Sequence, residues 1–164
     1  STNVPGRAQY IVYTNNSWVI SYSRSSNIRF RSCAASDITD WGDEVDGIGM
    51  SHSTTNDFSV KMAAANGNVV AFSEGDVDIN RFTVSGKTIG TVSRKIITDD
   101  ISGISNPKSI ATDGTTWIVG CNDGDAAKST DNGANWQQIV DDFIPAGNIK
   151  TDWDGIAANV VLPL

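Results

Sequence analysis

The eight residues from Ser129 to Trp136 constrain the fold more than any other part of the chain, because they read Ser-x-Asp-x-Gly-x-x-Trp. Asn132-Gly133 is a turn dipeptide, since glycine accepts a positive φ without steric cost. The Asp131 carboxylate can accept hydrogen bonds from backbone N–H groups inside the turn, and Ser129 is placed to bond the turn from its other side. Trp136 follows on the outgoing strand, where its ring can fold back beneath the turn. The stretch therefore predicts a β-hairpin with a polar staple above and an aromatic plug below.

The four fixed positions, Ser129, Asp131, Gly133 and Trp136, resemble the Asp-box or BNR repeat. This repeat occurs in sialidases, sortilin-type receptors, photosystem assembly factors, xyloglucanases and phage tail proteins. In those families the box occurs once per blade of a β-propeller, lies between the third and fourth strands, and is structural rather than catalytic. The resemblance covers about one blade directly. It implies an all-β, propeller-like fold in which the four box residues have a structural role.

The composition favours the same fold class and excludes several functions. Only 19% of the residues are charged, and Ser, Thr, Asn and Gly supply most of the polarity, a mix that favours short strands and tight turns. The formal net charge is −7 and there is no basic cluster, so we expect no nucleic-acid partner. No apolar run is long enough for a membrane-spanning helix, so we expect no membrane insertion.

A turn followed by an apolar strand recurs along the chain. The strand residues Trp18, Val69 and Trp117 follow such turns and are 51 and 48 residues apart. A spacing of about 40–50 residues is typical of four-stranded propeller blades. We therefore expect a single domain over residues 1–164 with about three and a half blades. The expected repeat units are 8–56, 57–106, 107–147 and a partial unit at 148–164.

Each unit divides into short expected strands, with helix content near zero. In the first unit they are Gln9–Tyr13, Trp18–Ser23, Asn27–Ser32 and a weak strand near Trp41. In the second they are Phe58–Ala64, Val69–Ser73, Val77–Val84 and Lys87–Ile96. In the third and the tail they are Ser109–Thr112, Trp117–Gly120, Ala126–Ser129, Trp136–Val140, Ile149–Asp152 and Ile156–Val161. The stretches between units are the Gly-, Ser- and Asp-rich Asp43–Asn56 and Asp99–Pro107, which we interpret as connections.

Three and a half blades leave an open sheet edge, which invites pairing with another chain. Three arrangements would satisfy that edge. The terminal strands Gln9–Tyr13 and Ile156–Leu164 could complete a blade together, the chain could be part of a longer propeller, or neighbouring subunits could cover the edge. Because Val160, Val161 and Leu162 have no charged neighbour, we expect Ala157–Leu164 to be paired within the chain or with another subunit.

Two Asp-Trp pairs are candidates for contact with a glycan or a protein partner: Asp40-Trp41 and Asp152-Trp153. Each pair could present an aromatic platform beside a hydrogen-bond acceptor. A glycosidase would need two opposed carboxylates, which could come from the acidic residues around Trp41 or Trp153. The competing interpretation is that the tryptophans plug the blades and the acids lie in solvated turns.

The sequence gives little support for a sialidase or for a zinc site. A sialidase needs an arginine triad and an Arg-Ile-Pro signature, and Ile28-Arg29-Phe30-Arg31 has no proline after it. Cys33 and Cys121, with one histidine in the chain, cannot build an ordinary zinc site, and we expect two small buried thiols. We expect no catalytic residues, no metal and no cofactor.

In composition and motif, the chain most resembles phage tail and other virion proteins with such repeats. The shared features are the low charge, the Ser/Thr/Asn/Gly-rich strands and the single intact box. The resemblance implies a non-enzymatic structural or adhesion module, binding a receptor or glycan, within a phage virion or tail. Its partners would be other protein subunits, and it would be oligomeric or embedded; a secreted or extracellular location is the alternative. Two further functions stay open: a glycosidase acting on polysaccharide, and an assembly factor that binds protein partners on a propeller face.

Overall fold

The chain folds into antiparallel β-sheets joined by turns. The structure is a computed structural model that describes residues 7–24, 26–51, 60–74, 76–104, 106–121 and 125–140. Within these ranges the helical content is one 3-10 turn, η1 (Ile97–Asp99). No helix in this part of the chain is long and apolar enough to cross a membrane. The predicted all-β class is therefore confirmed.

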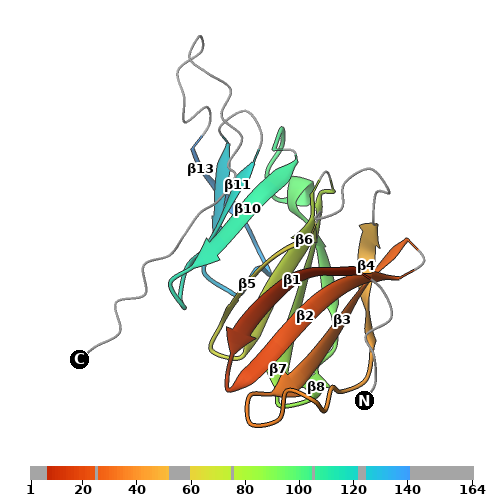
Figure 1. The fold of residues 1–164 in the computed structure, drawn as a ribbon. Coiled ribbons are helices and arrows are strands. Elements are labelled where there is room, and N and C mark those ends of the chain that lie inside the picture. Colours follow the sequence, from red (N-terminus) through yellow and green to blue (C-terminus); the bar gives the residue numbers. More distant parts are fainter. Residues whose placement is uncertain are drawn as a thin grey trace.

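Three sheets follow one another along the chain (Figure 1). Strands that are adjacent in sequence are hydrogen-bonded within each sheet, except that β9 pairs with β7 rather than with β8. The first contains β1 (Arg7–Thr14), β2 (Ser17–Arg24), β3 (Asn27–Ala34) and β4 (Val45–Ser51). The second contains β5 (Val60–Ala65), β6 (Asn68–Ser73), β7 (Asp78–Ser85), β8 (Thr88–Ile89) and β9 (Ser93–Ile96). The third contains β10 (Pro107–Thr112), β11 (Trp117–Cys121), β12 (Ala126–Ser129) and β13 (Gln137–Val140). None of these sheets closes on itself in the described residues.

The recurring turn of the sequence joins the first and second strands of each sheet. Asn15 and Asn16 have φ angles of 47° and 53°, and Asn66 and Gly67 have 51° and 77°. Two successive residues with positive φ form the two-residue hairpin turn that matches the twist of the flanking strands. The third turn is longer and has Gly114 at φ 98°. The spacings of 51 and 48 residues thus relate equivalent positions in successive sheets.

Two strand predictions were wrong. The fourth strand of the first sheet is β4, inside the stretch expected to be a connection, whereas Trp41 forms only an isolated bridge to Cys33. The glycines of β4 suggested a linker, but Gly47 is closely packed: an added Cβ there would lie 3.3 Å from the Phe30 ring, so a larger residue would be crowded. The expected strand Lys87–Ile96 is divided into β8 and β9, which pair with different parts of β7.

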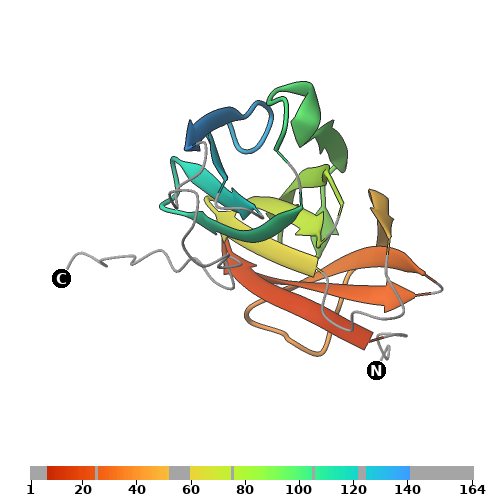
Figure 2. The same cartoon turned by 90° about the horizontal axis from the view of Figure 1, so that it is seen from above.

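The core consists of two clusters of buried side chains, one on each face of the second sheet. The second sheet lies between the first and the third (Figure 2). Because side chains alternate along a strand, Val69 packs toward the first sheet while Val70 and Phe72 pack toward the third. The strand β6 is therefore apolar at nearly every position, as expected for a strand buried on both faces. The first strands of the sheets also meet, since β5 contacts both β1 and β10.

The two cysteines are buried free thiols, as the sequence predicted, and Cys121 belongs to the cluster between the second and third sheets. The expected tail strands Ile149–Asp152 and Ile156–Val161 lie outside the described residues, and so does the expected pairing of Ala157–Leu164. The candidate contact residues Asp152 and Trp153 lie outside them as well.

Candidate functional site

The turn within Ser129–Trp136, which we call the Asp-box turn after the motif it resembles, connects β12 and β13, the third and fourth strands of its sheet. Asp131 Oδ1 accepts hydrogen bonds from the backbone N–H groups of Ala134 at 3.1 Å and Asn135 at 2.9 Å. Ser129 Oγ donates to Asp131 Oδ1 at 2.7 Å and accepts from the Gly133 N–H at 2.9 Å. These are the bonds that the sequence led us to expect, and they occupy both side chains fully with the turn itself.

Trp136 fills the space beneath the turn. Its side chain is buried in the cluster between the second and third sheets, and its indole N–H donates to the Gly133 carbonyl at 3.2 Å. Its backbone N–H donates to Asp100 Oδ2 at 2.8 Å, and Asp100 comes from the connection after η1. Sequence reasoning missed Asp100, because nothing local to the box indicates a partner 36 residues away. The box therefore links its hairpin to the preceding sheet.

The hydrogen bonds to Asp131 also determine its charge. Partial burial opposes ionisation, but hydrogen bonds from the side chain and backbone of Asn135, from Ser129 and from Ala134 outweigh it. Together they lower the pKa of Asp131 to about 2. A carboxylate so firmly ionised and so fully bonded within its own turn is suited to a structural role.

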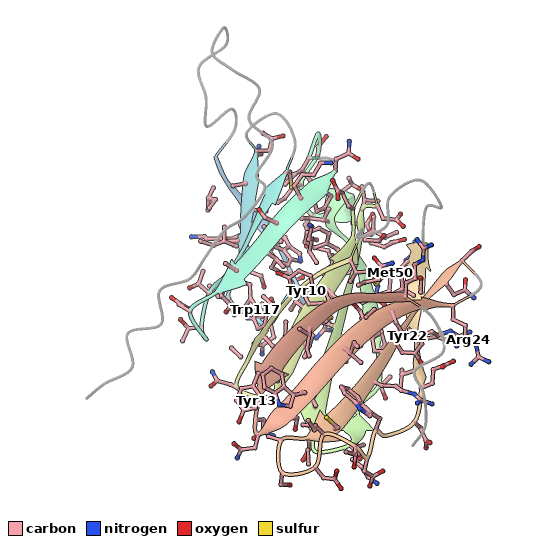
Figure 3. The ribbon with its side chains drawn as sticks, in the orientation of Figure 1. Tyr10, Tyr13, Tyr22, Arg24, Met50 and Trp117 are labelled. Atoms are coloured by element: carbon pink, nitrogen blue, oxygen red, sulfur yellow. The ribbon has the colours of Figure 1, made fainter. Side chains whose placement is uncertain are left out.

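The outward face of the first sheet is the larger candidate site. Val19 points into the core, so Trp18 and Ile20 point outward, and Tyr13 and Ile11 lie directly opposite them on β1. The Tyr13 and Trp18 rings are 4.8 Å apart. Figure 3 shows Tyr13 near the end of β1, with Tyr22 and Arg24 toward the opposite end of the sheet. We call this surface the open face.

A hollow of about 310 Å³ lies on the open face and is lined by Ile11, Trp18, Ile38 and Trp41. Ile11 and Ile38 are 54% and 63% exposed, values that are high for such apolar side chains. The predicted contact residue Trp41 is therefore part of a surface feature, together with Trp18, which sequence reasoning had assigned only to a repeated strand. Its neighbour Asp40 forms an ion pair with Lys87 at 2.7 Å. Because the four lining residues are all apolar, the hollow suits apolar side chains better than sugar hydroxyls.

Glu44, one of the carboxylates near Trp41, is held by several groups. It accepts a hydrogen bond from the Tyr22 hydroxyl, lies 3.2 Å from Arg24 Nη1, and lies 3.6 Å from Arg29 Nη1. The Tyr22 bond and the two guanidinium groups lower the pKa of Glu44. Burial and the bond to Glu44 raise the pKa of Tyr22 to about 12. Glu44 is thus stabilised as an anion, the opposite of what a general acid requires.

Arg31 lies opposite Ile20 and therefore belongs to the open face. Its Nε and Nη1 atoms are buried and have no hydrogen-bond partner in the described part of the chain. Leaving a buried donor unpaired costs about 1–3 kcal/mol.

No protein-family model matches the sequence, and the search of curated proteins found no match either. The geometry of the open face is therefore the main guide to function.

Proposed function

We propose that this protein is a non-enzymatic structural module of a larger protein assembly, in which a second copy of the chain packs against the open face of β1–β4. The observation that carries the proposal is the exposed apolar surface formed by Ile11, Tyr13, Trp18 and the hollow beside Trp41. Contiguous exposed apolar surface commonly marks a protein–protein contact. The assembly that the sequence resemblance implies is a phage virion or tail.

The same proposal treats the three sheets as successive blades of a propeller-like arrangement. In support, the first turns of neighbouring sheets are hydrogen-bonded to one another: the Gly67 N–H donates to Thr14 Oγ1 at 2.8 Å, and Asn66 Nδ2 donates to the Gly114 carbonyl at 2.9 Å. Each space between neighbouring sheets is filled by a core cluster. The open face is then the position at which a further sheet would pack.

A second copy fits the open face because the border of this face carries both signs of charge. Arg24 stands at the end of β2 and Arg31 in the middle of β3, and Asp40 lies beside the hollow and Asp46 beside Arg29. In a contact related by a two-fold axis, the same patch meets itself, so each copy must offer groups of both signs.

The ion pairs and hydrogen bonds of the carboxylates near Trp41 favour a role other than glycoside hydrolysis. Asp40 is paired with Lys87, and Glu44 is bonded to Tyr22 and two arginines. A glycosidase needs one carboxyl group with a raised pKa to protonate the leaving group, whereas the pKa of Glu44 is lowered. These acids are therefore better explained as ion-pair partners that shape the face.

Sedimentation velocity over a range of protein concentrations tests the proposal. We expect the intact chain to self-associate and the double variant Ile11→Ser, Ile38→Ser to sediment as a monomer, because both side chains are largely exposed and line the hollow. The matched control is Ile139→Ser, which removes an exposed isoleucine of β13 and should leave association unchanged. A monomeric intact chain at every concentration, or an equal loss in the control, would overturn the proposal.

A further inference from the structure

A second hollow, of about 270 Å³, lies on the opposite side of the second sheet from the open face. Its polar lining comes from two places. Asn68, Arg81, Thr83, Thr91 and Ser93 belong to the second sheet and the loop before β9, and Asn132 comes from the Asp-box turn. We call it the inter-sheet cleft.

The cleft forms where the side chains between the second and third sheets change from apolar to polar along β6 and β7. Val70 lies opposite Arg81, and Arg81 lies opposite Ser93, so these three side chains share the face that packs toward the third sheet. Further along this face, Phe72 and Ile79 are fully buried in the core cluster. Toward the Asp-box turn the apolar residues give way to polar ones. The alternating pattern of β7 thus directs Arg81 into the space between the sheets.

Arg81 forms no hydrogen bond or ion pair with any described residue. Arg24, Arg29 and Arg94, by contrast, each lie within 4 Å of a carboxylate oxygen. The residues that line the cleft include no acidic side chain, although the chain as a whole has a net charge of −7. A partly buried guanidinium without a carboxylate partner, in a hollow free of acids, indicates an anionic ligand.

The other polar groups of the cleft are suited to hydroxyls. Asn132 Oδ1 accepts the Trp117 indole N–H at 3.2 Å, which leaves its amide N–H groups free to donate. Asn68 Nδ2 donates to the Asn66 carbonyl at 3.2 Å, which leaves the Asn68 side-chain oxygen as an acceptor. The hydroxyls of Thr83, Thr91 and Ser93 can both donate and accept. The cleft therefore offers one cation and several neutral donors and acceptors within a volume suited to one sugar ring.

We propose that the inter-sheet cleft binds a carboxylated sugar, namely a hexuronic acid residue of an acidic polysaccharide. Arg81 pairs with the carboxylate through parallel N–H···O bonds, and the Asn, Thr and Ser groups hold the ring hydroxyls. The cleft and the open face lie on opposite sides of the second sheet. Ligand binding at the cleft consequently does not depend on self-association. The proposed sugar site can therefore be disproved without affecting the proposed contact at the open face, and the reverse also holds.

Isothermal titration calorimetry of the full chain with D-glucuronate, D-glucose and acetate tests this site. We expect glucuronate to bind with a Kd of about 1 mM or tighter, and each of the other two probes to bind at least about tenfold more weakly, because each lacks one half of the recognised chemistry. Equal binding of glucose and glucuronate would overturn the assignment of Arg81. No binding of glucuronate, or equal binding of acetate, would overturn the site as a sugar site.

Variants locate the binding. Arg81→Gln should weaken glucuronate binding by about tenfold or more and should leave the melting temperature unchanged, because Arg81 has no carboxylate partner to lose. Thr91→Val provides a second test that keeps the charge and removes one hydroxyl, and it should weaken binding severalfold. The control is Arg94→Gln, which removes an arginine that pairs with Asp78 and does not line the cleft, and it should leave affinity unchanged. An unchanged Kd in both cleft variants, or an equal loss in the control, would contradict the proposal.

Discussion

Asp131 shows how a single carboxylate can define a turn. It accepts bonds from the Ala134 and Asn135 backbone, from the Asn135 side chain at 2.7 Å and from Ser129. The neighbouring Gly133 has a φ of 80°, and an added Cβ there would lie 3.2 Å from a Val70 methyl group. The backbone conformation therefore favours glycine at this position, and the close contact with Val70 disfavours a larger side chain. Each fixed position of the motif has a separate physical cause.

The ionisation of Asp131 predicts a pH dependence of stability. Because its pKa is about 2 in the folded protein and near 4 in an unfolded chain, folding gains stability from this group at pH values above about 4 and loses it as the pH falls toward 2. Asp131→Asn should be less stable than the intact chain by about 1 kcal/mol at pH 6, and the difference should vanish near pH 2. Urea unfolding at a series of pH values measures both. A difference that stays constant down to pH 2 would assign the effect to something other than the charge.

The turns between first and second strands act as elements that join the sheets. Asn15 Nδ2 donates to the Val84 carbonyl of the second sheet at 3.2 Å, and Asn66 Nδ2 makes the equivalent bond to Gly114 of the third. The same two asparagines have positive φ, which asparagine tolerates better than most residues. One residue type thus serves both the local hairpin and the contact with the next sheet.

Asn66→Asp separates these two roles, because aspartate also tolerates positive φ but has no amide donor. We expect a loss of about 1 kcal/mol in the free energy of unfolding. The control is Asn16→Asp, since Asn16 acts through its side-chain oxygen, which accepts the Tyr13 hydroxyl at 3.0 Å and remains in aspartate. Chemical denaturation of the two variants side by side gives the comparison. Equal stabilities would mean that the amide of Asn66 contributes nothing to sheet contact.

At the scale of the whole molecule, the second sheet is the common wall of both core clusters. Val69 belongs to the cluster shared with the first sheet and Ile79 to the cluster shared with the third, and both side chains are fully buried. Because both clusters include side chains of β6 and β7, disrupting the packing of one cluster should also destabilise the other through these strands. The three sheets are therefore expected to unfold together.

Ile79→Ala and Val69→Ala test this cooperativity. Ile79→Ala should lower the free energy of unfolding by about 2–4 kcal/mol, and Val69→Ala by somewhat less because fewer methyl groups are removed. In each variant the transitions followed by tryptophan fluorescence and by far-UV circular dichroism should coincide. Transitions that separate in one variant and coincide in the other would show that the clusters fold independently.

The sequence by itself determined the local features of this protein. The Asp-box hairpin, the Asn-Asn and Asn-Gly turns, most strand positions and the all-β class follow from short-range rules of φ, side-chain hydrogen bonding and period-two alternation. These rules act over a few residues and hold in nearly any surroundings. The same reasoning failed at β4, because its glycines resemble a linker until the Phe30 ring is known to lie against Gly47.

Only the tertiary structure decided which distant residues meet. Asp100 reaches the Trp136 backbone, Trp18 joins Trp41 at the hollow, and Arg81 faces the Asn132 turn. Each of these pairs is separated by more than twenty residues, and which pairs meet depends on how neighbouring sheets are packed. Pattern and spacing carry no information about that packing, since the same strands could bury the same faces in several arrangements. The box residues were therefore readable from the sequence, whereas the open face and the inter-sheet cleft were not.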